Sequence, residues 1–299
     1  MADIRVRDEQ LPSSAQSSRM TPRLVSRVWG GERLVALGSS AAVTPPIGEA
    51  WFGEIGSQNH PLVKLLDVAD RLSVQVHPTD ALAAELHGTG SIGKREAWVI
   101  LDAAPGAHLL LGRDPSVSAD QLQHALESGS DVAPLLAKIQ VTAGDVLDVP
   151  PGTLHALMPG LLVWEVQQPS DRTYRVSDWG RSSGERPLHH AEALRAVNAA
   201  ATAQQVARLD WEAPGTRTLI GNDAFTVTVV VGPWSEPMQL PHGAIATLIS
   251  SPSMSGVGSG AAAHVAGIAL QPLQSVLMTA GSAAIEITHG LALLFASRP

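Results

Sequence analysis

The sequence predicts a mainly β protein made of two β-sandwiches or barrels, with a few helices between and inserted. Short apolar and β-branched runs recur along the chain, broken by Gly, Pro, Ser and Asp; RLSVQVHP, EAWVILD and FTVTVVVG are examples. Their lengths and spacing are typical of the strands of a sandwich or barrel. Hydrophobic residues make up 44% of the 299 residues and charged residues 16%, which indicates a globular protein with a sizeable core.

Three segments are expected along the chain. Residues 1–20 are polar, lack the apolar core of a secretory signal, and are expected to be disordered. Residues 21–195 should form the first β-domain, which carries the clustered His and acidic residues. Residues 196–299 are rich in Gly, Ala and Ser, and should form a second β-domain without metal ligands.

Two stretches have helical rather than strand character. One covers about 118–138, where Ser118 is a plausible N-cap, and forms an insertion in the first domain. The other covers about 190–208, is rich in Ala and Leu, and should link the two domains. The pair His189-His190 lies at its start and is interpreted as a solvated turn or helix start.

Charge and composition exclude several classes of partner and site. The formal net charge is -8 and no dense Lys/Arg run occurs, which argues against a nucleic-acid partner. No apolar run is long enough to cross a membrane, so a cytoplasmic location is expected. The chain has no cysteine, so a metal would need His, carboxylate, amide or water ligands. The sequence does not predict the oligomeric state.

Three short segments carry candidate metal ligands. In LSVQVHP the alternation places Ser73, Gln75 and His77 on one face of a strand. In GKREAWVIL a strand would place Lys94, Glu96 and Trp98 on one face. In VPPGTLHAL, His155 follows a tight Pro-Pro-Gly turn.

Taken singly, these segments have ordinary explanations, namely a solvated strand face, a charge cluster at a strand entrance and a hydrogen-bonded histidine. Together they supply two His, one Glu and one Gln. These are nitrogen and oxygen ligands that suit Zn²⁺ or another divalent ion and leave a coordination position open.

A family resemblance adds to this interpretation. The segments LSVQVHP, GKREAWVIL, VPPGTLHALMPG and WEVQQPSDRTYRVSDWGR occur in the order found in small bacterial type I mannose-6-phosphate isomerases, and the similarity spans Arg27 to Leu188. The resemblance implies two cupin-like jelly-roll domains and one divalent ion per chain, usually zinc. It implies that the metal ligands are Gln75, His77, Glu96 and His155, that Arg175 acts at the reacting carbons, that Lys94 lies beside the ligand Glu96, and that Ser73 contacts a substrate phosphate.

The implied reaction interconverts mannose 6-phosphate and fructose 6-phosphate through an enediol(ate). The sequence does not single out the proton-transfer group: Lys94, Asp171 and a metal-bound water are all candidates, and Lys94 could instead hold the phosphate. The chain departs from the family pattern at Phe52-Gly53-Glu54, which precede Ser57, and at Arg95, where a small polar residue is more usual. Both departures could alter the substrate pocket, so they leave the identity of the sugar phosphate open. Two alternatives stay open, an isomerase of another sugar phosphate and a non-catalytic sugar-binding or regulatory cupin.

Overall fold

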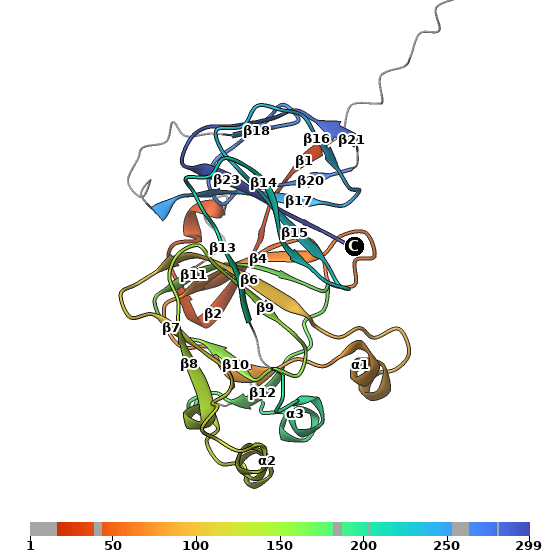
Figure 1. Cartoon of the computed structure of the whole chain (residues 1–299). Coiled ribbons are helices and arrows are strands. Elements are labelled where there is room, and N and C mark those ends of the chain that lie inside the picture. The colour runs from red at the N-terminus through yellow and green to blue at the C-terminus, as the bar shows by residue number, and fades with distance from the viewer. Residues whose placement is uncertain (1–16, 39–43, 182–186, 202–203, 253–262, 280) are drawn as a thin grey trace, which may run out of the picture.

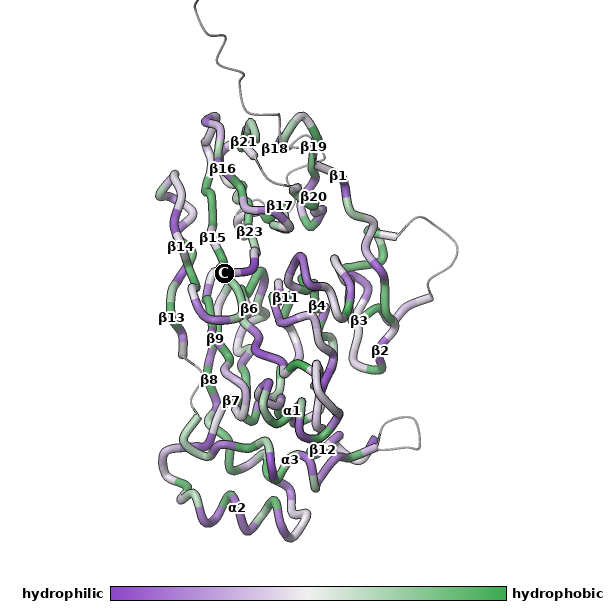
Figure 2. Tube along the Cα trace, turned by 90° about the vertical axis from the view of Figure 1, so that its right-hand side faces the viewer, coloured by the Kyte–Doolittle hydropathy of each residue, from purple (hydrophilic) through white to green (hydrophobic). Residues whose placement is uncertain are grey.

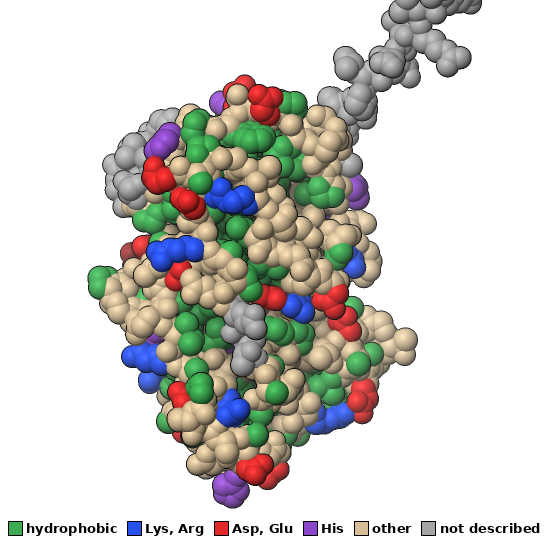
Figure 3. All heavy atoms as spheres, in the orientation of Figure 1, with side chains coloured by type: hydrophobic (Ala, Val, Ile, Leu, Met, Phe, Trp, Pro, Cys, Tyr) green, Lys and Arg blue, Asp and Glu red, His purple; other side chains and the backbone are tan. Residues whose placement is uncertain are grey.

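The computed structural model describes residues 17–38, 44–181, 187–201, 204–252, 263–279 and 281–299. It stacks the sheets of two β-units along one direction, with helices at one end (Figure 1). Within these ranges, no helix is long and apolar enough to cross a membrane. On the face drawn in Figure 3, basic and acidic side chains are interspersed instead of gathered in one patch.

The first unit pairs a seven-stranded with a five-stranded antiparallel sheet. The larger sheet has the order β13-β9-β6-β11-β4-β3-β2, with strands Gln204–Arg208, Asp145–Val149, Glu96–Ala103, Leu161–Gln167, Leu62–Val68, Ile47–Phe52 and Arg23–Gly31. The smaller sheet has the order β12-β5-β10-β7-β8, with strands Tyr174–Ser177, Val74–Val76, His155–Leu157, His108–Arg113 and Leu136–Gln140.

The second unit is built from three further sheets. Its six-stranded sheet has the order β1-β20-β17-β23-β15-β14, with strands Ser17–Met20, Ser275–Met278, Ile245–Ser250, Leu291–Ser297, Thr226–Val231 and Gly215–Gly221. The three-stranded sheet is β19-β18-β22, with strands Ile268–Leu270, Ala263–Val265 and Ile285–Ile287, and a two-stranded sheet pairs β16 (Met238–Leu240) with β21 (Gly281–Ala283).

The central strand β6 shows why the layers stack. Its alternation sends Ala97 and Val99 into a core shared with the six-stranded sheet, and Trp98 and Ile100 into the core facing the five-stranded sheet. All four side chains are buried, as expected for a strand covered on both faces. Glu96 has the parity of Trp98 and therefore faces the interior of the first unit.

Three α-helices occur in the described chain: α1 (Asp80–His87), α2 (Ala119–Ser128) and α3 (His190–Ala196), besides the 3-10 turns η1 (Val35–Leu37) and η2 (Ala133–Leu135). Helices α2 and α3 cover the outer face of the five-stranded sheet, where Leu122, Leu126 and Ala193 pack against Val74 and Val76. Both helices mix hydrophilic and hydrophobic residues along their length (Figure 2).

Both predicted helices are shorter than expected. The predicted helix at 118–138 starts at the expected N-cap, because Ser118 Oγ accepts from Gln121 N, but Gly129 ends it in the left-handed conformation. The chain then enters η2 and strand β8, which pairs with β7. The predicted helix at 190–208 ends at Ala196, and Gln204–Arg208 instead form β13, which extends the larger sheet beside β9.

Strand pairing also crosses the expected domain limits. Of the segment 1–20 expected to be disordered, residues 1–16 lie outside the described residues, and Ser17–Met20 form strand β1. This strand pairs with β20 of the second unit, whereas β13, placed by the sequence in the second domain, belongs to the first unit. The second unit therefore includes a strand from the segment 1–20, and the first unit includes a strand from the expected second domain, 196–299.

Candidate metal centre and active-site cavity

Four of the candidate residues converge between the two sheets of the first unit. Gln75 on β5 pairs with His155 at the start of β10, and Glu96 begins β6 in the opposite sheet. Ligand atoms of His77, Glu96 and His155 all lie within 4.8 Å of one another, and these residues can hold one metal ion. Gln75 Nε2 lies 3.2 Å from His155 Nε2, so the Gln75 amide is next to the site where these three residues would hold the ion.

The carboxylate of Glu96 is at the centre of this group. Its Oε1 lies 3.1 Å from His155 Nε2, and its Oε2 lies 3.3 Å from His77 Nε2. The ammonium of Lys94 lies 2.8 Å from Oε2 and 3.2 Å from His77 Nε2. Lys94 therefore lies beside the centre, as the alternation Lys94-Arg95-Glu96 predicts.

Backbone carbonyls fix the orientation of both imidazoles. His77 Nδ1 lies 2.9 Å from the carbonyl oxygen of Arg172, and His155 Nδ1 lies 3.0 Å from that of Thr153. A carbonyl can only accept, so each Nδ1 carries the proton and each Nε2 keeps a lone pair, which faces Lys94 Nζ in His77 and the Gln75 amide nitrogen in His155. Histidine ligands of metals commonly have such an outer partner.

The donor set fits a divalent ion. Both oxygens of Glu96 are buried, and among the described residues Oε2 pairs with the Lys94 ammonium, whereas Oε1 faces His155 Nε2 without a hydrogen bond. Buried polar atoms are nearly always hydrogen-bonded, and a cation satisfies a carboxylate in the same way. Gln75 fits with one change: its Oε1 accepts from Ser73 Oγ at 3.1 Å, so the amide must turn over to offer oxygen to an ion.

Burial and neighbouring charges set the protonation states. Burial lowers the pKa of His77 to about 3, with a smaller contribution from the Lys94 ammonium, and burial also lowers the pKa of His155. Burial alone would raise the pKa of Glu96, but Lys94 and the two imidazoles hold it well below its usual range. The group thus offers two neutral imidazoles and a carboxylate at neutral pH, the forms that bind metal.

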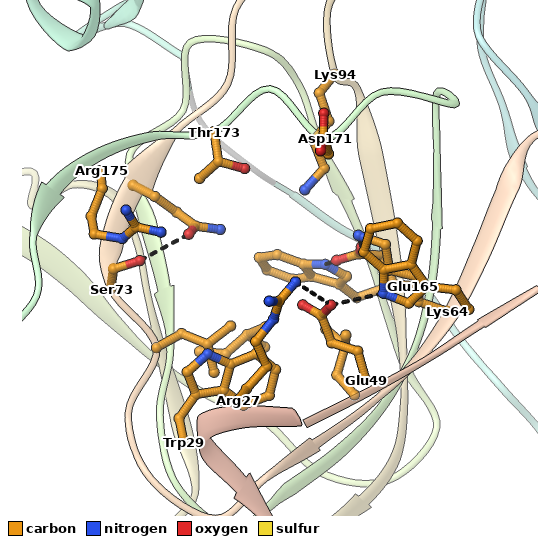
Figure 4. Close-up of a pocket in the computed structure, with 16 residues that line it drawn as sticks. Arg27, Trp29, Glu49, Lys64, Ser73, Lys94, Glu165, Asp171, Thr173 and Arg175 are labelled. Carbon is orange, nitrogen blue, oxygen red and sulfur yellow. Dashed lines mark hydrogen bonds and ion pairs between the residues drawn. The ribbon is translucent and has the colours of Figure 1, made fainter. Parts of the chain in front are cut away.

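A cavity of about 220 Å³ opens beside the metal centre. Four candidate residues line it, namely Ser73, Gln75, Lys94 and Arg175, and Asp171 joins them. In Figure 4, Lys94 and Asp171 lie at one end of the cavity, while Ser73 and Arg175 lie along one side. The segments singled out by sequence therefore meet around a single cavity.

A buried charged wall was missed at the sequence level. Lys64 Nζ pairs with Glu165 Oε1 at 3.3 Å, and Glu165 Oε2 accepts from Trp98 Nε1 at 3.0 Å. Glu49 Oε2 accepts from Arg27 and from Trp51 Nε1, at 2.9 and 2.7 Å. The available signal was a charged residue with apolar residues on both sides within a strand, Lys64 in LVKLLDV and Glu165 in LLVWEVQQ.

No protein-family model matches the chain. Among curated proteins, the probable mannose-6-phosphate isomerase GmuF of Bacillus subtilis is 36% identical over 214 residues, which are 60% of this chain and 67% of that protein. The chain belongs to the mannose-6-phosphate isomerase family. The mannose-6-phosphate isomerase of Streptococcus mutans is 38% identical over 181 residues, or 59% of this chain and 56% of that protein.

Solved structures of mannose-6-phosphate isomerases share the fold. The Bacillus subtilis enzyme superposes with a TM-score of 0.75 at 24% identity, over 93% of this chain and 98% of that one. A zinc-bound mannose-6-phosphate isomerase superposes with a TM-score of 0.67 at 14% identity, over 94% and 99%. The predicted family and the mainly β, two-cupin fold are confirmed.

Proposed function

We propose that this chain interconverts mannose 6-phosphate and fructose 6-phosphate through an enediol(ate), with one divalent ion, Zn²⁺, at His77, Glu96, His155 and Gln75. The observation that carries the proposal is the buried His-Glu-His group at the edge of a cavity lined by both basic and acidic side chains, in a member of this family. The cytoplasmic location expected from the sequence stays a prediction.

The chemical problem is the weak acidity of a carbon next to a carbonyl. A bound divalent ion would polarise the carbonyl and hydroxyl oxygens at the two reacting carbons. Arg175 supplies a permanent positive charge on the cavity wall, and its guanidinium can donate to the same oxygens as negative charge develops. We therefore assign Arg175 to electrostatic stabilisation of the enediol(ate).

Lys94 is suited to donating a proton or holding an anion. Burial alone would lower its pKa, but Glu96 and Glu165 raise it above the ordinary value, so the amine is charged at neutral pH. A charged ammonium cannot accept the proton taken from carbon. We propose that Lys94 donates to substrate oxygens or binds the phosphate together with Ser73, and that Asp171 on the same cavity accepts the proton.

Elemental analysis and an isomerase assay test the proposal together. Purified protein should contain about one divalent ion per chain and convert mannose 6-phosphate. Replacing either His77 or His155 by Ala should give metal-poor, inactive protein, whereas His124→Ala, an exposed change on α2, should keep both metal and turnover. Arg175→Ala should lower kcat by about 100- to 1,000-fold at unchanged metal content.

Other outcomes would contradict separate parts of the proposal. Full metal occupancy in both histidine variants would overturn the ligand assignment. Metal-replete protein inactive on every aldose and ketose phosphate of a panel would identify a non-catalytic cupin. Turnover of a different sugar phosphate would keep the chemistry and correct the substrate.

A further inference from the structure

Arg175 lies on strand β12, which is at the edge of the five-stranded sheet among the described residues. In that part of the chain β12 pairs with β5, and Arg175 is opposite Gln75 in that pair. In an antiparallel strand the N–H and C=O of one residue point to the same side. Those of Arg175 point away from β5, because both bind His189.

His189 takes the place of a neighbouring strand at this point. Its backbone N–H donates to the Arg175 carbonyl at 2.8 Å, and its ring Nδ1 accepts from the Arg175 N–H at 3.2 Å. The carbonyl of Pro187 accepts from Arg175 Nη1 at 3.0 Å. Residues 187–189 therefore hold both the backbone and the guanidinium of an arginine that lines the cavity.

The position of His189 in its own helix shows that the ring is committed to this contact. His189 is the N-cap residue of α3, where Ser, Thr, Asp or Asn normally accept from the first turn. Its ring turns to Arg175 instead of capping the helix. The sequence-based interpretation of His189-His190 as a solvated turn or helix start is right about the helix start, since His189 is the N-cap and His190 begins α3, but the His189 side chain is half-buried against β12.

The contact requires a neutral ring. An accepting Nδ1 carries no proton, so the proton of the neutral form is on Nε2. Among the described residues, the ionisable groups facing the ring are Arg175 and Tyr174 of β12 and Glu192 of α3, and His87 of α1 binds the Tyr174 hydroxyl at 2.9 Å. Protonation would remove the acceptor and add a positive charge beside the Arg175 guanidinium.

We propose that His189 is a positioning residue, whose neutral ring fixes Arg175 at the wall of the cavity. Its effect on catalysis rests on the proposed isomerase function, whereas the contact itself does not. Burial, with a smaller effect of Arg175, holds the pKa of His189 below its ordinary value of 6.5, so the accepting form prevails at neutral pH.

The decisive comparison is between His189→Ala and His189→Asn. Asn places its amide oxygen as many bonds from the backbone as His places Nδ1, so it can accept from Arg175 N–H at every pH. We expect His189→Ala to lower kcat about 10- to 100-fold, with KM and metal content changed little, because the reacting groups lose their alignment. His189→Asn should stay within about threefold of wild type, and His190→Ala, an exposed neighbour, should match wild type.

The pH profile separates positioning from a general structural role. For the wild type, kcat/KM should fall as pH drops below 6.5, and His189→Asn should lack the part of this fall that is due to the ring; metal content measured at each pH removes the contribution of metal loss. An acid limb identical in the two proteins would overturn the proposal. So would His189→Ala with wild-type kcat, or Asn as damaging as Ala in a folded protein.

Hydrogen exchange at the Arg175 amide tests the contact without any substrate. Exchange should be slow in the wild type and in His189→Asn, and faster in His189→Ala. Equal protection in all three proteins would overturn the inference. A wild type that turns over no sugar phosphate would contradict the proposed function alone, and the exchange result would still decide the role of His189.

Discussion

At the residue scale, burial decides which groups of the metal centre carry charge. His77, Glu96 and His155 are each 1–2% exposed, so water stabilises none of their charged forms. The imidazoles respond by staying neutral, whereas Glu96 stays ionised because Lys94 lies 2.8 Å away. The carboxylate of Glu96 and the two neutral imidazoles thus have the protonation states in which they bind a metal ion.

The pH dependence of stability follows from these states. In metal-stripped protein the unfolded chain protonates His77 below pH 6.5, while the folded chain, with a pKa of about 3, does not. The unfolded state then binds more protons, so the free energy of unfolding should fall as pH drops from 6.5 to 5, by about 2 kcal/mol for His77 alone. His155 acts in the same direction.

Urea denaturation of the metal-stripped protein at pH 7, 6 and 5 measures this slope. The variant His77→Gln, which cannot titrate, should show a shallower slope, and His124→Ala should keep the wild-type slope. A wild type and a His77→Gln variant with equal slopes would contradict the assigned protonation states.

At the element scale, the residues at the two ends of helix α2 fix where it starts and stops. Helix α2 begins with a capping box, in which Ser118 Oγ accepts from Gln121 N and Gln121 Oε1 accepts from Ser118 N. Its apolar residues Leu122, Ala125 and Leu126 then face the five-stranded sheet. Gly129 ends the helix in a conformation with positive φ, which turns the chain back towards β8.

Loss of the Ser118 cap should therefore lower the free energy of unfolding and leave isomerase turnover unchanged. Ser118→Ala should lower the free energy of unfolding by about 1 kcal/mol, and Ser118→Asp, which still accepts, should restore most of it. Isomerase turnover should be unchanged in both, because α2 contributes no residue to the cavity lining. Chemical denaturation alongside the assay checks both statements, and a large loss of turnover in folded Ser118→Ala protein would contradict them.

At the scale of the whole molecule, the two β-units share one core. Val99 and Trp164 of the seven-stranded sheet pack with Val227, Ile245 and Leu294 of the six-stranded sheet. A polar link crosses this core: Trp164 Nε1 donates to Thr247 Oγ1 at 3.0 Å, and Thr247 also bonds Ser275 at 2.9 Å. The second unit thus covers the back of the sheet that carries Glu96.

Removing the Thr247 hydroxyl should weaken the junction. Thr247→Val keeps the shape but leaves the buried Trp164 N–H without its acceptor, which should lower the free energy of unfolding by about 1–3 kcal/mol. Thr218→Val, the same change at an exposed position of the edge strand β14, should stay within about 0.5 kcal/mol of wild type. Equal effects of the two substitutions in denaturation experiments would contradict a specific role for the link.

Local sequence determined the strands, the Ser118 cap and the ligand residue types. These features depend on alternation and on contacts within a few residues, as in Ser73-Gln75-His77 and in the Ser118-Gln121 box. The proximity of His77, Glu96 and His155 followed from the family resemblance, because no local rule brings three distant segments together.

Tertiary structure decided what depends on long-range pairing. Gln204–Arg208, which the sequence places at the end of a helix, form β13 because β9 offers a strand edge there, and tertiary context overrides weak helix propensity. Lys64 and Glu165 could be paired only once β4 and β11 lay in register. His189 gained its role because the fold brings its ring and backbone N–H against the backbone of Arg175, 14 residues earlier, which no spacing in the sequence reveals.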